Sequence, residues 1–481
     1  MEKNESKKLY LYPILILLIA FGTYFYHYYK PEAVFWDENY HVASAYKYLN
    51  GVMFMETHPP LGKLFIALGE WMLHPNTTLN THYFLTTDYI KTFPRHFLFD
   101  GVRLFPTLFG VFGSVLFFYI LYQISKNSDI SFLFTSLYLF ENGFILQSRA
   151  AMLESSQIFF LFFAIYYFLK LLDRENINWK NYLLFGLLVG FSVSIKLNSL
   201  ILIILFPFLF FRYSYPNTLK LVKEFILNGI SFVVGISIIW IAVFYIHFSL
   251  GTKVYKKYSA SQEYLTIIKN HSEKNPLNFY IMMRDNIKYM ANYNKKVPKY
   301  NPCKKGENGS LASTWPFMNK TINYRWKKSN HKVSYLYLVG NPLVWFSVVF
   351  AIILSTAMVI SYFVFKMPIT NRRYFYIISA FLSMYWAYMF VMFNIPRVMY
   401  LYHYFIPLFF GTFILFTLYN YIFEKELETN DRVLKIATIL YIFEIIYLFW
   451  YFRVFDYFIP LTTQEFMQRV WFDFWKLKPI L

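Results

Sequence analysis

The chain is poor in charged residues and in cysteine. Only 15% of its 481 residues are charged, whereas a soluble domain carries about a quarter, so the composition argues against a soluble globular protein. A single cysteine, Cys303, excludes an intramolecular disulfide and a cysteine-based zinc site. The sequence has no internal repeat, no glycine-rich phosphate-binding loop and no nucleic-acid-binding motif.

Hydrophobic residues make up 57% of the chain and aromatic residues 23%, which is too many aromatic residues for a disordered chain. The apolar residues gather in long runs, as membrane-spanning helices require. We predict an all-α polytopic membrane protein with about 11 transmembrane helices, at residues 10–29, 103–123, 130–146, 155–172, 181–195, 198–211, 225–249, 341–365, 373–393, 399–422 and 433–452. The fifth and sixth segments are short and flank Lys196. They predict a tight hairpin, because one straight helix would bury that ammonium at mid-membrane.

The distribution of lysine and arginine predicts the orientation of the bundle. Short cytoplasmic loops carry an excess of these residues, and an inner N-terminus places Lys126, Arg174, Arg212 and Arg373 inside. An odd number of spans then places the C-terminus outside. The first 30 residues are similar to a signal peptide, but no small-residue cleavage site follows them. We therefore expect an uncleaved anchor.

Two long segments are predicted on the outer side. Residues 30–102 contain two amphipathic helix patterns, one from near Asp37 to Asn50-Gly51 and one from Pro59-Pro60 to His74-Pro75. Residues 251–335 hold 17 lysines and arginines against four acids, so this loop is either a solvated basic loop or a surface for anionic lipid. We divide the chain into an N-terminal membrane module (1–250), a large external loop (251–340) and a C-terminal membrane module (341–481).

Reactive side chains from separate stretches fall at the outer ends of the predicted spans. Taken singly, each has a structural explanation, such as a helix cap or a snorkelling cation. Glu141 inside the third span is a costly buried carboxylate, which indicates either function or a structural partner. The shared outer location favours one site, made of Asp37, Glu38, His58, Lys63, Arg103, Arg149, Glu154, Lys196, Arg397, Tyr402 and His403.

Seven stretches carry a family resemblance, in the order FWDENYHVASAYKYLNGVMFMETHPPLGKLFIALGE, VRLFPTLFG, ENGFILQSRAAMLES, GLLVGFSVSIKLNSL, STWPFMNKTINYRW, GNPLVW and RVMYLYHYFIPLFFG. They resemble the protein O-mannosyltransferase family, which implies a GT-C-type bundle. The chain departs from the family pattern at Glu154, where we expect aspartate. Residues 251–335 are too short for the β-trefoil insert of fungal and animal members, so the chain resembles the shorter prokaryotic form.

The resemblance implies transfer of a mannosyl unit from a polyprenyl- or dolichyl-phosphate sugar to Ser/Thr hydroxyls of proteins, with inversion. A hydroxyl nucleophile needs a general base, whereas a lipid phosphate leaves as a stable anion and needs fixed positive charge. A hydrolytic glycosidase would instead need two opposed carboxylates. The resemblance assigns Asp37 as the base, and Glu38 is the second candidate or an orienting partner.

The other candidate residues are assigned to substrate binding. Phosphate or pyranose contacts are expected from Arg103, Arg149, Lys196 and Arg397. His58 and His403 are expected to form hydrogen bonds with the sugar or the phosphate. Trp315 is expected to cover the acceptor site, and Lys63, Glu154 and Tyr402 complete the set. No cofactor is predicted. A divalent metal on Asp37, Glu38 and His58 stays open, because cations can neutralise the phosphate without one.

Two alternatives stay open at this point. One is a related transferase that modifies a lipid or a saccharide, and the other is a transporter of lipid-linked sugars, which predicts mid-membrane charges and repeats. The expected partners are the prenyl-phosphate sugar, a Ser/Thr-containing acceptor protein and membrane lipids, with no nucleic acid. The expected location is a plasma membrane with the site on the external or periplasmic face, or the endoplasmic reticulum membrane in a eukaryote.

Overall fold

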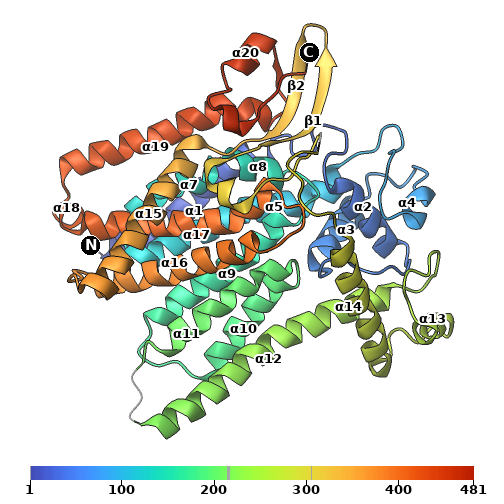
Figure 1. The fold of residues 1–481 in the computed structure, drawn as a ribbon, viewed down its shortest axis with the longest axis horizontal. Coiled ribbons are helices and arrows are strands. Elements are labelled where there is room, and N and C mark those ends of the chain that lie inside the picture. The colour runs from blue at the N-terminus through green and yellow to red at the C-terminus, as the bar shows by residue number, and fades with distance from the viewer. Residues whose placement is uncertain (1, 214–216, 305, 481) are drawn as a thin grey trace.

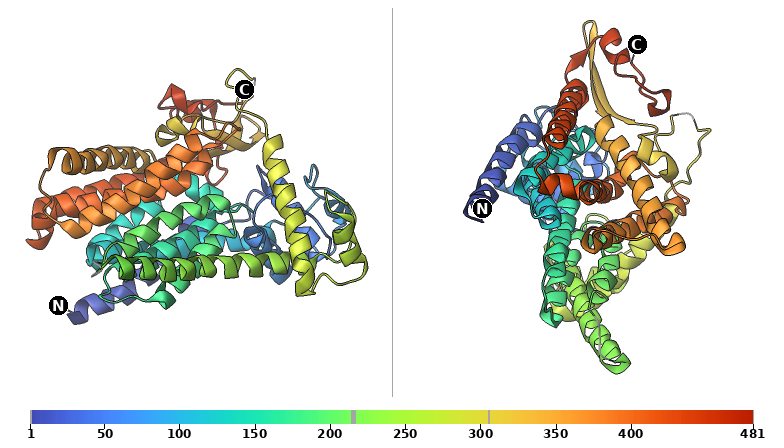
Figure 2. Two further views of the ribbon diagram at one scale, coloured as in Figure 1. Left: turned by 60° about the horizontal axis from the view of Figure 1, so that its bottom comes forward. Right: turned by 90° about the vertical axis from the view of Figure 1, so that its left-hand side faces the viewer.

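The computed structural model describes residues 2–213, 217–304 and 306–480. Long helices lie side by side along one direction, with the N-terminus at one end of the bundle (Figure 1). The helices of the two predicted outer segments gather at the opposite end, as Figure 1 and the left view of Figure 2 show. They are α2 (Glu38–Leu49), α3 (Leu61–Leu73), α4 (His82–Thr86), α13 (Gln262–Lys269) and α14 (Phe279–Lys296). The two predicted outer segments therefore share one end of the molecule.

Eight helices of the described residues are long and apolar enough to cross a membrane. They are α1 with η1 (Glu2–Ala20, Phe21–Phe25), α5 (Asp100–Ser125), α9 (Glu154–Leu172), α12 (Thr218–Leu250), α15 (Pro342–Phe365), α16 (Arg372–Phe393), η5 with α17 (Leu401–Tyr404, Phe405–Ile422) and α19 with η6 (Arg432–Phe452, Arg453–Phe455). The short helix α18 (Glu424–Glu428) joins α17 to α19. The chain is a mostly helical, multi-pass membrane protein.

The remaining three predicted spans differ from continuous long helices. Residues around Lys196 form the shorter α10 (Trp179–Val193), η2 (Leu197–Ile204) and α11 (Leu205–Phe210), with Lys196 in the turn between them. The predicted span 130–146 is broken into α6 (Ser128–Phe134), α7 (Ser136–Leu139) and α8 (Asn142–Ser148). The two segments that flank Lys196 are short, as predicted, and the count of about 11 transmembrane helices stays a prediction beside the eight long ones of the described residues.

Glu141 explains the last of these breaks. Its backbone is extended (φ −88°, ψ 102°) and its carboxylate accepts a hydrogen bond from the backbone N–H of Phe144. The other carboxylate oxygen accepts from the backbone N–H of Asn341 and from Trp345 Nε1, each at 2.9 Å. The buried Glu141 therefore has structural partners that join α8 to α15, and the mid-span carboxylate needs no catalytic explanation.

The first outer segment contains helices where the sequence predicts them. Helix α2 spans Glu38–Leu49, with Asp37 at its N-cap position and Asn50 at its C-cap position. Helix α3 spans Leu61–Leu73 and ends at His74, which is left-handed (φ 46°). A short helix, α4 (His82–Thr86), follows.

The large outer segment adds helices α13 (Gln262–Lys269), η3 (Pro276–Asn278), α14 (Phe279–Lys296) and η4 (Ala312–Phe317). Strands β1 (Ile322–Ser329) and β2 (Lys332–Leu338) form an antiparallel hairpin that also pairs with β3 (Pro460–Leu461). The chain then continues through α20 (Thr463–Met467) and η7 (Asp473–Trp475). The all-α prediction missed this three-stranded sheet. Because the last five residues of β2 are all buried, that strand lacks the alternation that reveals a half-buried strand.

The two membrane modules share one aromatic core. Phe117 of α5 lies 5.2 Å from Phe413 of α17 between ring centres, and Phe162 of α9 lies 5.2 Å from Phe409. Burial of such aromatic rings dominates core packing. This core holds the outer ends of α9 and α17 next to the first outer segment, although their residues are far apart in sequence.

Candidate active site

Asp37 lies where the first outer segment turns into α2. Its side chain makes no capping hydrogen bond, so the simple explanation of a helix cap does not hold. The preceding residue, Trp36, has φ +52°, a conformation that costs about 1–3 kcal/mol for a bulky residue and clusters at functional sites. The one hydrogen bond that the carboxylate of the half-buried Asp37 receives among the described residues comes from Tyr402 Oη, at 3.3 Å from Oδ2.

Lys196 and Glu154 form an ion pair beside Asp37. The Lys196 ammonium also lies 5.5 Å from the centre of the Tyr402 ring. The pKa of Asp37 is raised to about 6, chiefly by burial and then by the charge of Glu154, while Lys196 opposes both effects. We refer to Asp37, Glu154, Lys196 and Tyr402 as the Asp37 cluster. It combines one available carboxylate with a positive charge.

Two histidines border the Asp37 cluster. The ring of His403 stacks on Tyr402 at 4.5 Å, and its Nδ1 lies 3.0 Å from the carbonyl oxygen of Tyr400. Burial, with the charges of Lys196 and Lys63, holds the pKa of His58 well below its usual range. His58 is therefore neutral at physiological pH, and a neutral imidazole both donates and accepts hydrogen bonds.

Lys63 is a neighbour whose charge is already compensated. Its ammonium lies 2.5 Å from Oε2 of the fully buried Glu56, and Tyr48 Oη donates to Oε1 of the same carboxylate at 3.0 Å. Removal of either partner would leave an uncompensated buried charge. Lys63 is thus held within the first outer segment, and its charge slightly lowers the pKa of Asp37.

Glu38 and Arg103 correct two of the predicted roles. Both are fully buried, and Arg103 Nε and Nη2 donate to the Glu38 carboxylate at 2.7 and 2.8 Å. Arg103 Nη1 donates to the carbonyl oxygens of Tyr29 and Pro31, and Nη2 also donates to Ala33. A guanidinium has five N–H donors, and here all five are used. Arg103 therefore has no donor left for a phosphate, and Glu38 is its structural partner.

Arg149 likewise serves as a tie between segments. Its Nη1 donates to the carbonyl oxygen of Asp456 at 2.5 Å, and its Nη2 donates to Tyr26 and His27. The guanidinium stacks 4.4 Å from the centre of the Tyr457 ring. With only 2% of its surface exposed, Arg149 joins the first span to the C-terminal segment. Its Nε has no hydrogen-bond partner among the described residues, and the expected phosphate contact stays a prediction.

Trp315 does not cover an acceptor surface. Its side chain is fully buried, its Nε1 donates to Ser310 Oγ at 2.9 Å, and its ring stacks on His403 at 6.0 Å. The large outer loop thus supports His403 through the stacked ring of Trp315. The predicted covering role is wrong because the indole lies behind the histidine.

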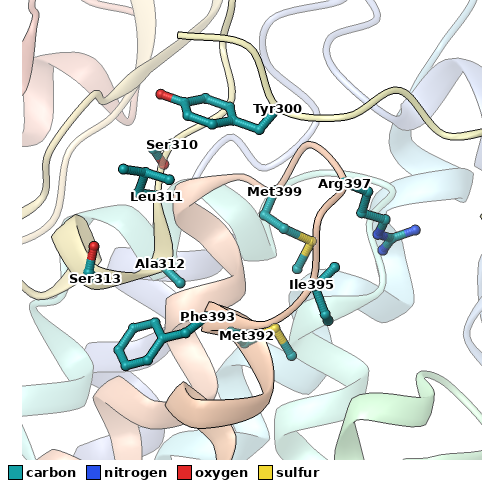
Figure 3. A pocket seen from close by; sticks show the side chains of 10 residues that line it. All are labelled: Tyr300, Ser310, Leu311, Ala312, Ser313, Met392, Phe393, Ile395, Arg397 and Met399. Carbon is teal, nitrogen blue, oxygen red and sulfur yellow. The ribbon is translucent and has the colours of Figure 1, made fainter.

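Arg397 stands beside a cavity between the large outer loop and the end of α16. The cavity measures about 170 Å³ and is lined by Tyr300, Ser310, Leu311, Ala312, Ser313, Met392, Phe393, Ile395, Arg397 and Met399 (Figure 3). The Arg397 side chain points away from the apolar Ile395 and Met399, and its Nη1 donates to Asn294 Oδ1 at 2.9 Å. Its charge lowers the pKa of His58, so Arg397 is a second cation near the site.

A smaller pocket opens directly at the Asp37 cluster. It is lined by Glu154, Gln157, Ile158, Lys196, Asn198, Tyr402, His403, Phe405 and Ile406. Charged and polar side chains lie next to apolar residues of α9 and α17 there. The pocket holds only about 10 Å³, which is room for about one water molecule.

Sequence reasoning missed two polar side chains of the site, Gln147 and Tyr324. Gln147 Nε2 donates to Glu154 Oε2 at 2.9 Å, and Tyr324 Oη donates to Gln147 Oε1 at 2.8 Å. Both lie within stretches that carry the family resemblance, but no spacing rule distinguishes them. Within residues 2–213, 217–304 and 306–480, no group of three His, Cys, Asp or Glu side chains is placed to hold a metal ion.

Comparison with known proteins assigns the family. The family model "Dolichyl-phosphate-mannose-protein mannosyltransferase" matches residues 14–252, and that of the "C-terminal four TMM region of protein-O-mannosyltransferase" matches residues 282–475. Protein O-mannosyl-transferase 2 of Drosophila melanogaster is 23% identical over 52% of this chain and 34% of its own length. Dolichyl-phosphate-mannose–protein mannosyltransferase 1 of Candida albicans is 30% identical over 50% of this chain and 28% of its own length. The chain thus matches about a third or less of these curated relatives.

Solved structures agree on the fold. One chain of the Saccharomyces cerevisiae Pmt1-Pmt2 complex bound to the sugar donor superimposes with a TM-score of 0.80 at 15% identity, over 98% of this chain and 92% of that chain. The apo oligosaccharyltransferase of Archaeoglobus fulgidus gives a TM-score of 0.52 at 10% identity, over 98% of this chain and 60% of that chain. The two family models together match most of the sequence, and the chain therefore belongs to the protein O-mannosyltransferase family.

Proposed function

We propose that the chain transfers a mannosyl or related hexosyl unit from a polyprenyl- or dolichyl-phosphate sugar to Ser/Thr hydroxyls of proteins, in a single inverting displacement. The observation that carries this proposal is the Asp37 cluster, in which a carboxylate with one weak partner lies beside a lysine. The names of the relatives supply the donor and acceptor classes.

Asp37 is the proton acceptor in this proposal. A general base contributes about 10²–10⁴-fold to rate when its pKa lies near the working pH. The pKa of Asp37 is raised by burial to about 6. At neutral pH the carboxylate is therefore ionised and more basic than an exposed aspartate, which suits it to accept the proton of the attacking hydroxyl.

Lys196 and Arg397 supply the positive charge for the leaving group. Bond cleavage leaves negative charge on the lipid phosphate, and fixed cations stabilise such charge more in the transition state than in the ground state. Glu154 is occupied by Lys196 and Gln147, so it is not a second free carboxylate. One free base with cations fits transfer from a phosphate, whereas a glycosidase needs two opposed carboxyl groups.

The arrangement also supports a place for each substrate. The prenyl chain stays in the membrane in this proposal, while its phosphate lies at Lys196, next to the span ends that carry Ile158, Phe405 and Ile406. The acceptor protein approaches from the end that carries α2, α3 and α14 (Figure 1). This end lies opposite the N-terminus and corresponds to the predicted external face, so the site faces the outside of a plasma membrane or the lumen of the endoplasmic reticulum.

A donor and acceptor screen with the purified full chain tests the proposal. Lipid-phosphate mannose and a Ser/Thr peptide should yield a glycopeptide, and the Asp37→Asn protein should form it about 10²–10⁴-fold more slowly. Transfer to a saccharide or lipid but never to peptide would instead identify a transferase of the related class. Movement of the donor across a vesicle membrane without any product would identify a transporter.

A further inference from the structure

Tyr324 occupies an irregular position in strand β1. In the ladder with β2, Asn323 pairs with Tyr337 and Arg325 pairs with Leu336, so the register shifts at Tyr324. An extra residue of this kind is a β-bulge, and bulges often re-aim a side chain next to an active site. The bulge turns Tyr324, which is only 8% exposed, toward the Asp37 cluster.

The Tyr324 hydroxyl begins a chain of three contacts that ends at Lys196. Tyr324 Oη donates to Gln147 Oε1 at 2.8 Å, Gln147 Nε2 donates to Glu154 Oε2 at 2.9 Å, and Glu154 Oε1 pairs with Lys196. Gln147 is 1% exposed and Glu154 is 6% exposed. Water therefore cannot readily replace any of these contacts.

The hydrogen bonds between Tyr324, Gln147 and Glu154 all have their donor on the Tyr324 side. A phenol hydrogen fixes the Gln147 oxygen toward Tyr324, which leaves the Gln147 amide hydrogens toward the carboxylate. Glu154 is then held by one oxygen on Gln147 and by the other on Lys196. Because Glu154 holds Lys196, the position of the ammonium beside Tyr402 depends on contacts that begin at Tyr324.

The same strand also holds the segment that precedes Asp37. The ring of Tyr324 lies 4.9 Å from Trp36 between centres, and Arg325 Nη1 donates to the carbonyl oxygen of Val34 at 2.8 Å. Strand β1 therefore contacts both sides of the site, the base through Trp36 and the cation through Gln147. Tyr324 and Gln147 are both buried, at 8% and 1% exposed, and they hold each other through the hydrogen bond between them.

We propose that Tyr324 and Gln147 are positioning residues, which act through Glu154 to hold Lys196 in place for the donor phosphate. This inference rests on the proposed function and deepens it. It assigns the end of the large outer loop a part in donor use, in addition to any contact with the acceptor.

A pair of matched tyrosine variants tests the inference. Tyr324→Phe should lower kcat/KM for the lipid-phosphate sugar about tenfold and leave KM for the acceptor peptide unchanged. Tyr335→Phe is the control, because Tyr335 lies on neighbouring β2, is buried, and accepts a hydrogen bond from the Ile480 backbone N–H at 2.9 Å. It removes an equivalent hydroxyl of the same sheet and should leave both constants unchanged. Equal losses in the two variants would show that the Tyr324 hydroxyl only stabilises the sheet and would overturn the inference.

A double-mutant cycle with Glu154→Gln adds a measurement that a purely structural role would not affect. If Tyr324 acts through Glu154, Tyr324→Phe should cost less than about twofold once Glu154 is replaced, because coupled residues are not additive. The same tenfold loss in both backgrounds would contradict the inference. Affinity for prenyl phosphate replaces turnover in any variant too slow to assay. A wild-type chain that neither binds prenyl phosphate nor transfers sugar would instead refute the proposed function itself.

Discussion

Two adjacent carboxylates at the start of α2 have opposite environments. Glu38 is fully buried, and its two oxygens accept from Arg103 twice and from the backbone N–H groups of Phe35 and Ala151. Asp37 is half-buried, and its carboxylate receives one hydrogen bond, from Tyr402, in the part of the chain that the structure describes. Both oxygens of Glu38 are thus occupied by structural partners, whereas the Asp37 carboxylate remains available to a substrate.

The difference shows how one short motif serves both structure and chemistry. The Glu38–Arg103 pair fixes the backbone of the Tyr29–Ala33 segment through three carbonyl oxygens. That segment leads into Trp36 and Asp37, so the Glu38–Arg103 pair holds the Asp37 carboxylate in place. A fully satisfied buried ion pair adds rigidity, and rigidity is what a catalytic group needs from its surroundings.

The most severe loss of activity is expected for Asp37→Asn. The amide has the same shape and still accepts from Tyr402, but it cannot take a proton from a hydroxyl. Transfer to a Ser/Thr peptide should fall by about 10²–10⁴-fold, while the unfolding temperature in detergent stays that of the wild type. Full activity in this variant would remove Asp37 as the base.

Glu38→Gln should instead affect stability before chemistry. The substitution leaves the buried Arg103 charge without its counter-ion, which costs about 3–5 kcal/mol when one partner of a buried pair is removed. Thermal unfolding in detergent measures the loss. Glu32→Gln is the matched control, because Glu32 pairs with Lys30 at a site where both side chains are about half exposed, and it should unfold like the wild type. An unchanged unfolding temperature for Glu38→Gln would show that the pair is not structural.

Sequence patterns predicted most of the helices because hydropathy and capping signals are local. The boundaries of α2 follow from Asp37 and Asn50-Gly51, and the turn at Lys196 follows from the cost of a mid-membrane ammonium. The break at Glu141 could not be predicted, because its partners Asn341 and Trp345 lie some 200 residues away. The sheet was missed because its burial depends on tertiary contacts.

For the site, the sequence predicted which residues lie at the outer ends of the spans. It could not separate side chains that are available to a substrate from those whose hydrogen bonds are all made within the protein. Arg103 and Lys196 look alike as cations at helix ends. Only the five filled donors of Arg103 show that it is structural. Tyr324 could not be identified at all, because a register shift in a hairpin brings it to the site.

Lys196→Ala tests the role of the positive charge in the Asp37 cluster. Removal of one charged contact from a developing oxyanion lowers the rate by about 10²-fold, so kcat/KM for the lipid-phosphate sugar should fall by that amount. KM for the peptide should change little. Lys327→Ala, which removes the same charge from an exposed position on β1, should have no effect on either constant. A change in peptide KM alone would show that Lys196 does not contact the phosphate.

The smallest predicted effect is a shift in pH dependence for Glu154→Gln. Asp37 must be ionised to act as a base, so kcat/KM should fall as the pH drops through its pKa of about 6. The Glu154 charge raises this pKa and Lys196 lowers it. Loss of the Glu154 charge therefore lowers the pKa of Asp37 and moves the acid limb to lower pH, by up to about one unit.

Glu263→Gln provides the control for this profile. Glu263 pairs with Arg284 at an exposed position of the large outer loop, so its replacement removes a paired carboxylate without a contact to Asp37. Its acid limb should coincide with that of the wild type. A limb that moved equally in Glu154→Gln and Glu263→Gln would show that the Glu154 charge does not act on Asp37.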